Sequence, residues 1–342
     1  MTDQNMYPDD ARTGAGEGSD IADKLVKTAE AMESAALEVR KVIIGQDEVV
    51  EQALVTLLAG GHALLVGVPG LGKTLLVETL GTVLGLAERR VQFTPDLMPA
   101  DILGSEILDE DENGRRRFRF VKGPIFCQLF MADEINRASP RTQSALLQAM
   151  QEARVSIAGE YHGLPQPFHV LATQNPIEQE GTYPLPEAQL DRFLTQITIG
   201  YPEKAAEREI VTATTGATRL QPNPILTPDE LSSAQQLVRH VPVGDSVIEA
   251  ILELVRGARP ETAEMEVVRE HVAWGPGPRA SQALMLACRA RAVVSGRLAP
   301  SVEDVVALAL PILRHRMALS FGARTEGVTL EDIIAQLTEG LR

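Results

Sequence analysis

The chain has 342 residues, of which 44% are hydrophobic, and this length is enough for about two domains that each bury a core. Its formal net charge of −15 disfavours a nucleic-acid ligand, because no basic excess is available to release counterions from a phosphate backbone. The two cysteines provide neither a disulfide framework nor the ligand spacing of a metal site. No apolar run is long enough to span a membrane and no signal peptide is recognisable, so we expect a cytoplasmic protein.

The amino-terminal part of the chain changes character near Asp20. Residues 1–19 are polar, rich in Asp and Gly and without hydrophobic periodicity, so they are predicted to be a disordered acidic tail. From Asp20 to Val39, apolar residues recur at helical spacing, which predicts an amphipathic helix. Residues 42–46 interrupt this pattern, and a second apolar helix is expected over residues 49–58.

A glycine-rich segment with the spacing G-x-x-x-x-G-K-T follows residues 63–66, which predict a short buried strand. Glycines allow successive backbone N–H groups to turn toward one point and bind phosphate oxygens. Lys73 is expected to neutralise the β- and γ-phosphates of a nucleoside triphosphate, and the Thr74 hydroxyl is expected to ligate Mg²⁺. A helix over residues 74–84 completes the strand–loop–helix context that this motif requires. The predicted nucleotide-binding residues of this segment are Gly67, Val68, Pro69, Gly70, Leu71, Gly72, Lys73, Thr74 and Leu75.

A second informative segment, residues 123–134, runs from apolar residues into Asp133 and Glu134. Open α/β sheets bind their ligands at the carboxyl ends of their strands. Asp133 is predicted to hold Mg²⁺ through water, because Mg²⁺ takes few carboxylates and keeps several waters. Glu134 is predicted to act as the general base on the attacking water. An apolar run that ends in Asp-Glu is a weak signal alone, and the phosphate loop upstream is what favours the functional interpretation.

A third strand is predicted over residues 169–174, and Asn175 follows it. If this strand lies beside the other two, Asn175 arrives near the γ-phosphate and orients the attacking water. The alternative is an asparagine that caps a turn before Pro176. Both interpretations remain open on the sequence.

Residues 186–193 predict a short helix that closes with Arg192. An arginine can stabilise the charge of a phosphoryl transition state, in its own subunit or in a neighbouring one. It can equally form an ion pair with Asp191 or Glu187. Spacing alone does not choose between these roles.

The alternation of strands ends after Pro202. Residues 204–226 contain a polar stretch with two prolines and predict a linker. Residues 227–342 are predicted to form a helical domain, because capping-box signals recur along them, at Thr227, Ser301 and Thr329. Arg279 opens one of these helices after the sequence Gly-Pro-Gly-Pro.

These stretches, in this order, resemble an AAA+ ATPase. The phosphate loop matches Walker A, Asp133 and Glu134 match Walker B, Asn175 matches sensor 1, and Arg192 matches the arginine finger. The sequences of three segments, 92–102, 132–138 and 173–176, are similar to those of MoxR-type ATPases. The resemblance to this family covers about residues 20–340.

The resemblance implies an α/β fold. An AAA+ αβα P-loop core with a parallel sheet would occupy residues 20–203, and an all-α lid domain would occupy residues 227–342. The segment before Walker A would contact adenine, through Ile44, Gly45 and Gln46. Arg279 matches sensor 2, which would face the γ-phosphate from the lid and report the nucleotide state as domain motion.

Two hairpins interrupt the predicted core. The first spans residues 105–120, and an Asn-Gly pair predicts its turn because both turn positions need positive φ. By position it matches the insert of the helix-2-insert clade, at about residues 97–122. A second alternating segment resembles the hairpin before sensor 1, at about residues 154–167, with His162 expected in a solvated turn. In related machines such hairpins face a central pore and touch substrate.

The resemblance implies an ATP-hydrolysing, Mg²⁺-dependent motor that works as a ring of identical subunits, expected to be a hexamer. Arg192 would complete the site of the neighbouring subunit. Arg137 would lie either at that interface or in a salt bridge with the acidic helix before it. MoxR-type proteins remodel or mature client proteins, often with a partner that carries a von Willebrand A domain. A magnesium chelatase-type motor subunit and a nucleotide-switched binding module with little turnover remain as alternatives. The net charge of −15 disfavours a helicase-like motor on nucleic acid.

Overall fold

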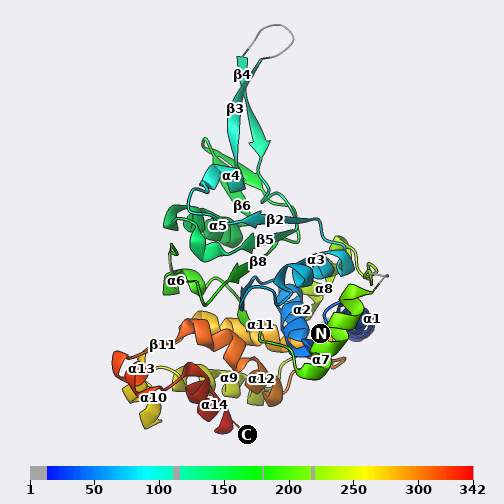
Figure 1. Cartoon of the computed structure of the whole chain (residues 1–342). Coiled ribbons are helices and arrows are strands. Elements are labelled where there is room, and N and C mark those ends of the chain that lie inside the picture. The colour runs from blue at the N-terminus through cyan, green and yellow to red at the C-terminus, as the bar shows by residue number, and fades with distance from the viewer. Residues whose placement is uncertain (1–13, 111–115, 179–180, 217–219, 342) are drawn as a thin grey trace, which may run out of the picture.

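A five-stranded parallel sheet forms the centre of the amino-terminal half of the computed structural model, which describes residues 14–110, 116–178, 181–216 and 220–341 (Figure 1). The strands lie in the order β2 (Glu88–Gln92), β5 (Leu129–Asp133), β8 (His169–Gln174), β1 (Ala63–Val66) and β9 (Thr195–Thr198). All neighbouring pairs are parallel. The segments that follow the strands therefore leave the sheet at one edge, as the sequence predicts for the phosphate loop, Asp133 and Asn175.

The two faces of the sheet pack against different helices, because successive strand residues point to opposite sides. Leu65, Met131 and Leu171 belong to a buried cluster with α2 (Asp47–Leu58) and α3 (Lys73–Val83). Leu64 and Phe130, their chain neighbours, belong to a second cluster with α5 (Pro140–Glu152). The predicted αβα core with a parallel sheet is confirmed.

Helix α1 (Gly14–Arg40) begins before the expected start at Asp20. It packs against α2 and α3 of the core and against α8 and α11 of the carboxyl-terminal half. Residues 1–13 of the predicted tail lie outside the described residues.

Two antiparallel hairpins extend from the core at the end away from the carboxyl-terminal helices (Figure 1). The first joins β3 (Gly104–Glu110) to β4 (Arg116–Lys122) and follows the short helix α4 (Pro99–Leu103). The second joins β6 (Arg154–Ile157) to β7 (Glu160–Gly163). His162 was expected in a solvated turn, but it lies half-buried in β7. Its ring stacks on Phe120 of the first hairpin, with centroids 4.1 Å apart, so the two hairpins brace each other.

A helix, α7 (Lys204–Thr215), occupies the first half of the segment predicted as a linker. The linker expectation followed the polar composition and the prolines, but both prolines lie beyond α7 and do not interrupt it. The core also contains the short helices η1 (Ile135–Arg137) and α6 (Glu187–Leu190). Another short helix, η2 (Arg314–Arg316), belongs to the carboxyl-terminal half and contacts α6.

The carboxyl-terminal half is helical, as predicted, except for a two-stranded ribbon of β10 (Val272–Trp274) and β11 (Ala318–Leu319). Thr227, Ser301 and Thr329 are the N-caps of three of its helices, so these start signals are confirmed. The helices are α8 (Pro228–Val238), α9 (Asp245–Gly257), α10 (Glu266–His271), α11 (Pro278–Val294), α12 (Val302–Leu313), α13 (Phe321–Glu326) and α14 (Leu330–Glu339).

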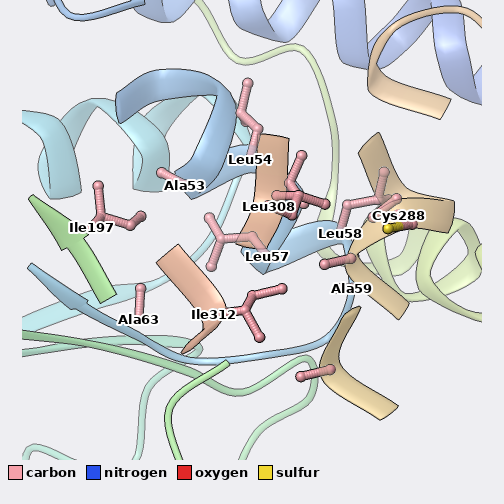
Figure 2. Packing of buried hydrophobic residues seen from close by; sticks show 14 of the residues in the cluster. Ala53, Leu54, Leu57, Leu58, Ala59, Ala63, Ile197, Cys288, Leu308 and Ile312 are labelled. Atoms are coloured by element: carbon pink, nitrogen blue, oxygen red, sulfur yellow. The ribbon is translucent and has the colours of Figure 1, made fainter. Parts of the chain in front are cut away.

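One buried cluster runs through both halves, where the sequence analysis expected a separate core in each domain. Helix α2 is apolar on most of its circumference, so it is buried between the sheet and the carboxyl-terminal helices. Figure 2 shows Leu54, Leu57 and Leu58 of α2 among Leu308, Ile312 and Cys288 of α12 and α11, with Ile197 and Ala63 of the sheet nearby. The phosphate loop and the carboxyl-terminal helices are thus joined through α2. In the described part of the chain, no helix combines the length and apolarity needed to cross a membrane.

Candidate nucleotide-binding site

The glycine-rich loop between β1 and α3 has the backbone conformation that phosphate binding needs. Gly70 and Gly72 have φ values of 86° and 76°, in the left-handed region that favours glycine. A side chain at Gly67 would place its Cβ 2.7 Å from the carbonyl oxygen of Ile199, so only glycine fits there. Helix α3 begins at Lys73, which directs the positive end of its dipole and its free N–H groups into the loop.

Lys73 is held inside this loop. Its Nζ donates hydrogen bonds to the carbonyl oxygens of Gly67 and, at 3.0 Å, of Val68. Burial lowers the pKa of Lys73, although the charges of Asp133 and Glu134 oppose this effect. A partly desolvated ammonium group beside a glycine-rich loop is well placed to bind the phosphates of a nucleotide.

The predicted catalytic and metal-binding residues converge on one pocket of about 400 Å³. It is lined by Pro69, Gly70, Gly72, Lys73, Thr74, Leu75, Arg90, Gln92, Asp133, Glu134, Thr173 and Asn175. We call it the phosphate pocket. Four separate stretches of sequence meet there, because β1, β5 and β8 are adjacent and parallel and β2 lies beside β5. The sequence predicts that these residues lie close together only if the strands have this order, and the structure has that order.

Asp133 is buried, with 8% of its surface exposed, and both of its carboxylate oxygens have partners. Thr173 Oγ1 donates to Oδ1 at 2.6 Å, and Arg90 donates to Oδ2 from Nε at 3.1 Å and from Nη2 at 2.5 Å. Arg90 and Thr173 were not predicted from the sequence as site residues. The available signal was positional, since both lie on strands that flank β5 and end at the same edge.

Glu134 has an unusual backbone, with φ 55° and ψ 52°, a conformation that non-glycine residues adopt at some cost. Its N–H donates to Thr173 Oγ1 at 2.8 Å, which stabilises this turn. Its carboxylate accepts hydrogen bonds from Gln92 Nε2 at 2.7 Å and from Arg137 Nη1 at 2.8 Å. Arg137 therefore forms a local salt bridge with Glu134, and this bond raises the pKa of the arginine. Gln92 begins a segment that resembles MoxR-type ATPases, but its contact with Glu134 was not predicted from the sequence.

The position of Asn175 is compatible with both roles that the sequence left open, the orientation of water and the capping of a turn. It is buried and lines the phosphate pocket, directly after β8. Its Oδ1 also accepts a hydrogen bond from the N–H of Ile177 at 3.2 Å, which caps the turn around Pro176. The capped turn fixes where the Asn175 side chain lies, and its action on a water stays a prediction.

A larger and mostly apolar pocket of about 700 Å³ adjoins the phosphate pocket and shares Pro69, Gly70, Gly72 and Leu75 with it. One wall comes from the segment before α2. It includes Ile44 and Gln46, and Gln46 Nε2 donates to the carbonyl oxygen of Leu71 at 3.3 Å. Gly45 is not a wall residue. Its φ is 71°, and it lies against Ala206 of α7.

The opposite wall of this pocket is α7, through residues such as Ile210, Val211 and Thr214, together with Tyr201 before it. A mostly apolar pocket of this size next to a phosphate site suits a purine base, and we call it the base pocket. This wall could not be predicted from the sequence, because residues 204–226 have the composition of a linker.

Comparison with known proteins shows the family to which this chain belongs. Residues 62–195 match the ATPase family associated with various cellular activities (AAA), and residues 264–337 match the AAA lid domain. Chaperone MoxR1 of Mycobacterium tuberculosis is 43% identical over 319 residues, which cover 93% of this chain and 84% of that protein. The chain belongs to the MoxR family of AAA+ ATPases.

Other members of the family agree with this assignment. Protein MoxR of Methylorubrum extorquens is 31% identical over 299 residues, which cover 82% of this chain and 86% of that protein. A solved structure from Cytophaga hutchinsonii superimposes with a TM-score of 0.87 at 37% identity, covering 94% of this chain and 98% of the other. Both comparisons span the AAA core and the lid, so the whole described architecture is that of the family.

The two arginines that family resemblance singled out, Arg192 and Arg279, lie outside the phosphate pocket of their own MoxR-type chain. They line a different pocket, of about 290 Å³, that shares no residue with the phosphate pocket or the base pocket. Arg279 Nη1 lies 3.5 Å from Asp191 Oδ2, so this structure does not place it toward the γ-phosphate site of the same subunit. Asp191 also pairs with Arg316, while the half-buried Arg192 lines the same small pocket.

The AAA core offers few protein ligands for a metal ion. Within the described ranges, no group of three or more His, Cys, Asp or Glu side chains lies close enough to hold one. The predicted Mg²⁺ ligands Thr74 and Asp133 both line the phosphate pocket. A site with two protein oxygens suits Mg²⁺, which usually completes its shell with phosphate oxygens and water.

Proposed function

We propose that this MoxR-family chain is an Mg²⁺-dependent ATPase that works as a ring and remodels client proteins. One observation carries the proposal: Lys73, Thr74, Asp133, Glu134 and Asn175 line a single pocket at the carboxyl edge of the sheet. These residues supply a cation for phosphate, two oxygens for Mg²⁺, a carboxylate base and a polar group to orient water. Family membership supports the same activity.

The residues present fit ATP and Mg²⁺. The loop glycines allow backbone N–H groups to bind phosphate oxygens, and the ammonium group of Lys73 donates to two carbonyl oxygens that phosphate can replace. The adjoining base pocket is closed by Ile44 and by Val211 of α7. Mg²⁺, when bound, neutralises charge on the phosphates, and Thr74 and Asp133 are the residues that would hold it.

Within the subunit, Glu134 is the proposed general base. Gln92 and Arg137 both donate to its Oε2, which holds the carboxylate at the phosphate pocket. The buried Asn175 side chain would orient the water from the neighbouring strand end. General-base catalysis of this kind contributes about 10²- to 10⁴-fold in rate.

The neighbouring subunit would complete the site. Arg192 and Arg279 line a pocket separate from the phosphate pocket of their own chain, which supports a role in trans for both. An arginine supplied in trans contributes about 10³- to 10⁵-fold in rate, so an isolated subunit should be slow. A closed ring of identical subunits presents each such arginine pocket to the next phosphate pocket, and we propose a hexamer.

Client remodelling is the proposed use of this activity. The relative from Mycobacterium tuberculosis bears the name chaperone. The first hairpin carries exposed apolar residues, with Phe118 at 72% and Leu108 at 55% exposure, and they face each other across its two strands. An exposed apolar pair on a projecting hairpin suits contact with a protein client. A partner with a von Willebrand A domain and a place in the cytoplasm, where ATP is available, belong to the same proposal.

The deciding experiment is the ATPase rate against protein concentration for wild type, Glu134→Gln and Arg192→Ala. We expect the wild-type rate per chain to rise cooperatively with concentration. Each variant should lose most of this rate while it still binds nucleotide. A mixture of the two variants should recover activity, because hybrid interfaces pair an intact base with an intact arginine. A flat rate per chain with a silent Arg192→Ala would refute the shared site and favour a nucleotide-switched binding module.

A further inference from the structure

Arg316, a lid residue in η2, holds the backbone on both sides of Arg192. Its Nε donates to Asp191 Oδ1 at 2.7 Å, and its Nη2 donates to the carbonyl oxygens of Phe193 at 2.6 Å and of Asp191 at 3.3 Å. Its Nη1 donates to the carbonyl oxygen of Leu194 at 3.1 Å. Asp191 directly precedes Arg192, and Phe193 and Leu194 are the two residues that follow it, so a single guanidinium group binds the backbone on both sides of Arg192.

The guanidinium of Arg316 has no freedom to turn. A fifth hydrogen bond runs from Nη1 to the carbonyl oxygen of Ile312, at 2.6 Å, in the preceding helix α12. Arginine has five N–H donors in a rigid planar fork, and here every one of them has an acceptor. Arg316 is only 2% exposed. Burial of an arginine is costly unless it is fully paired, so this arrangement specifies one geometry.

Neighbouring lid residues strengthen the same contact. His315 Nε2 lies 3.1 Å from the carbonyl oxygen of Phe193, which therefore has a partner from each of two successive lid residues. Asp191 divides its carboxylate, with Oδ1 bonded to Arg316 and Oδ2 near Arg279 at 3.5 Å. Asp191 thus links both lid arginines to the residue that precedes Arg192.

We propose that Arg316 is a positioning residue for Arg192. By binding the residues on both sides of Arg192, Arg316 attaches them to the lid, so the position of the lid determines where Arg192 meets the next subunit. This inference rests on the proposed function, in which Arg192 completes the neighbouring site. The core supplies Arg192 along the chain, yet the hydrogen bonds that fix its flanking carbonyl groups come from the lid. A shift of the lid would therefore reach the neighbouring phosphate pocket without a change in the subunit's own pocket.

The test uses Arg316→Lys, which keeps the charge but has only three donors on a point-like group and cannot reach the five acceptors that surround the guanidinium. We expect kcat of the assembled protein to fall about 10²-fold, as for a misplacement of about 1 Å, with nucleotide affinity unchanged. The second readout is the ATPase activity of a mixture of Arg316→Lys and Glu134→Gln subunits. Activity should return, because Glu134→Gln subunits present a correctly held Arg192 to the intact phosphate pockets of Arg316→Lys subunits.

Two further variants separate positioning from general damage. Arg314→Lys makes the same change in the same turn, but Arg314 bonds Thr198 and Glu331 and leaves the residues that flank Arg192 untouched. It should keep most of the wild-type kcat. Asp191→Asn keeps the size of the side chain and weakens its bond to Arg316, so it should show a smaller kcat loss that the same mixture restores. Thermal unfolding of each variant verifies that it is folded.

The outcomes distinguish this inference from the function on which it rests. If Arg192→Ala and Glu134→Gln complement each other but Arg316→Lys keeps full kcat, the ring stands and the positioning role is wrong. The positioning role is also wrong if Arg316→Lys loses activity that the mixture cannot restore, because its defect then lies in its own pocket. If no mixture recovers activity, the shared site fails and this inference fails with it.

Discussion

Arg90 on β2 donates two hydrogen bonds to Asp133 on the neighbouring strand, at the carboxylate oxygen opposite the one that Thr173 binds. The carboxylate proposed for Mg²⁺ therefore already carries a cation. The Arg90 side chain is 51% exposed, so its pairing with Asp133 is screened by water and is weak. Arg90 can leave at little cost when the metal binds.

Removal of Arg90 should therefore tighten Mg²⁺ binding. For Arg90→Gln we expect the Mg²⁺ affinity of the complex with a non-hydrolysable ATP analogue to rise by up to about fivefold, the equivalent of about 1 kcal/mol for an exposed ion pair. Isothermal titration with Mg²⁺ measures this directly. Arg89→Gln is the matched control, since Arg89 is the preceding residue of β2, is exposed and does not line the phosphate pocket. Weaker Mg²⁺ binding in Arg90→Gln would mean that Arg90 supports the metal site.

Two buried histidines should make the fold sensitive to mild acid. Burial lowers the pKa of His169 to about 4 and, with the nearby Arg316, lowers the pKa of His315 well below its ordinary value. The folded state keeps both rings neutral while the unfolded chain takes up protons near pH 6.5. Their contribution to stability is therefore complete above about pH 6.5 and is lost as the pH falls toward the folded pKa.

The expected loss is about 1.4 kcal/mol per pH unit for each histidine between about pH 6.5 and 4.5. Urea unfolding at a series of pH values measures it. His169→Gln should be less stable at neutral pH, because it disrupts the bond to the Gly61 carbonyl, but its stability should fall less steeply with acid. An identical slope in wild type and variant would rule out this assignment.

Gly45 should be essential for the close packing of α7, one wall of the base pocket, against the segment before α2. Its φ of 71° is costly for other residues, and a Cβ there would lie 2.3 Å from Cβ of Ala206. Gly45→Ala should therefore push α7 outward, lower stability and weaken the binding of a fluorescent ATP analogue. Gly296→Ala is the control, because Gly296 has φ 72° but no atom within 4 Å of the added Cβ. It should lose only the backbone term, about 1–2 kcal/mol, with unchanged nucleotide affinity. Equal affinity in the two variants would contradict the steric argument.

Asp304 should be the most stability-critical carboxylate of the lid. It is fully buried and accepts hydrogen bonds from Arg291 at 2.6 Å and from Arg297 at 2.7 and 2.5 Å. Burial tends to raise the pKa of Asp304, but these bonds and the Ser301 N–H outweigh it and keep the pKa below the ordinary value. Arg291 also pairs with Glu51 of α2 at 2.9 Å, so the network joins lid and core.

Asp304→Asn leaves these arginines without their shared anion, and we expect it to lower the free energy of unfolding by about 3 kcal/mol. Chemical denaturation measures the loss. Glu303→Gln changes the adjacent, exposed carboxylate and should cost less than about 0.5 kcal/mol. A loss below about 1 kcal/mol for Asp304→Asn would show that the arginines find other partners.

Local features could be predicted from the sequence, but contacts between residues far apart along the chain could not. Capping residues at Thr227 and Thr329 were readable because their bonds span three residues. The linker expectation over 204–226 was inaccurate for α7, because that helix has no buried residue and its polar composition resembles a loop. His162 was assigned to solvent because the stacking ring of Phe120 comes from another hairpin.

The sequence by itself determined the phosphate loop, the Asp133–Glu134 strand end and the division into an αβα core and a helical half. Each of these depends on contiguous residues whose backbone and periodicity suffice to define them. Only the tertiary structure decided that Arg90 and Thr173 bind Asp133, that α7 closes the base pocket, and that Arg316 rather than Arg192 pairs with Asp191. These partners lie far apart along the chain, and the strand order and the packing of the lid determine which of several possible charges they meet.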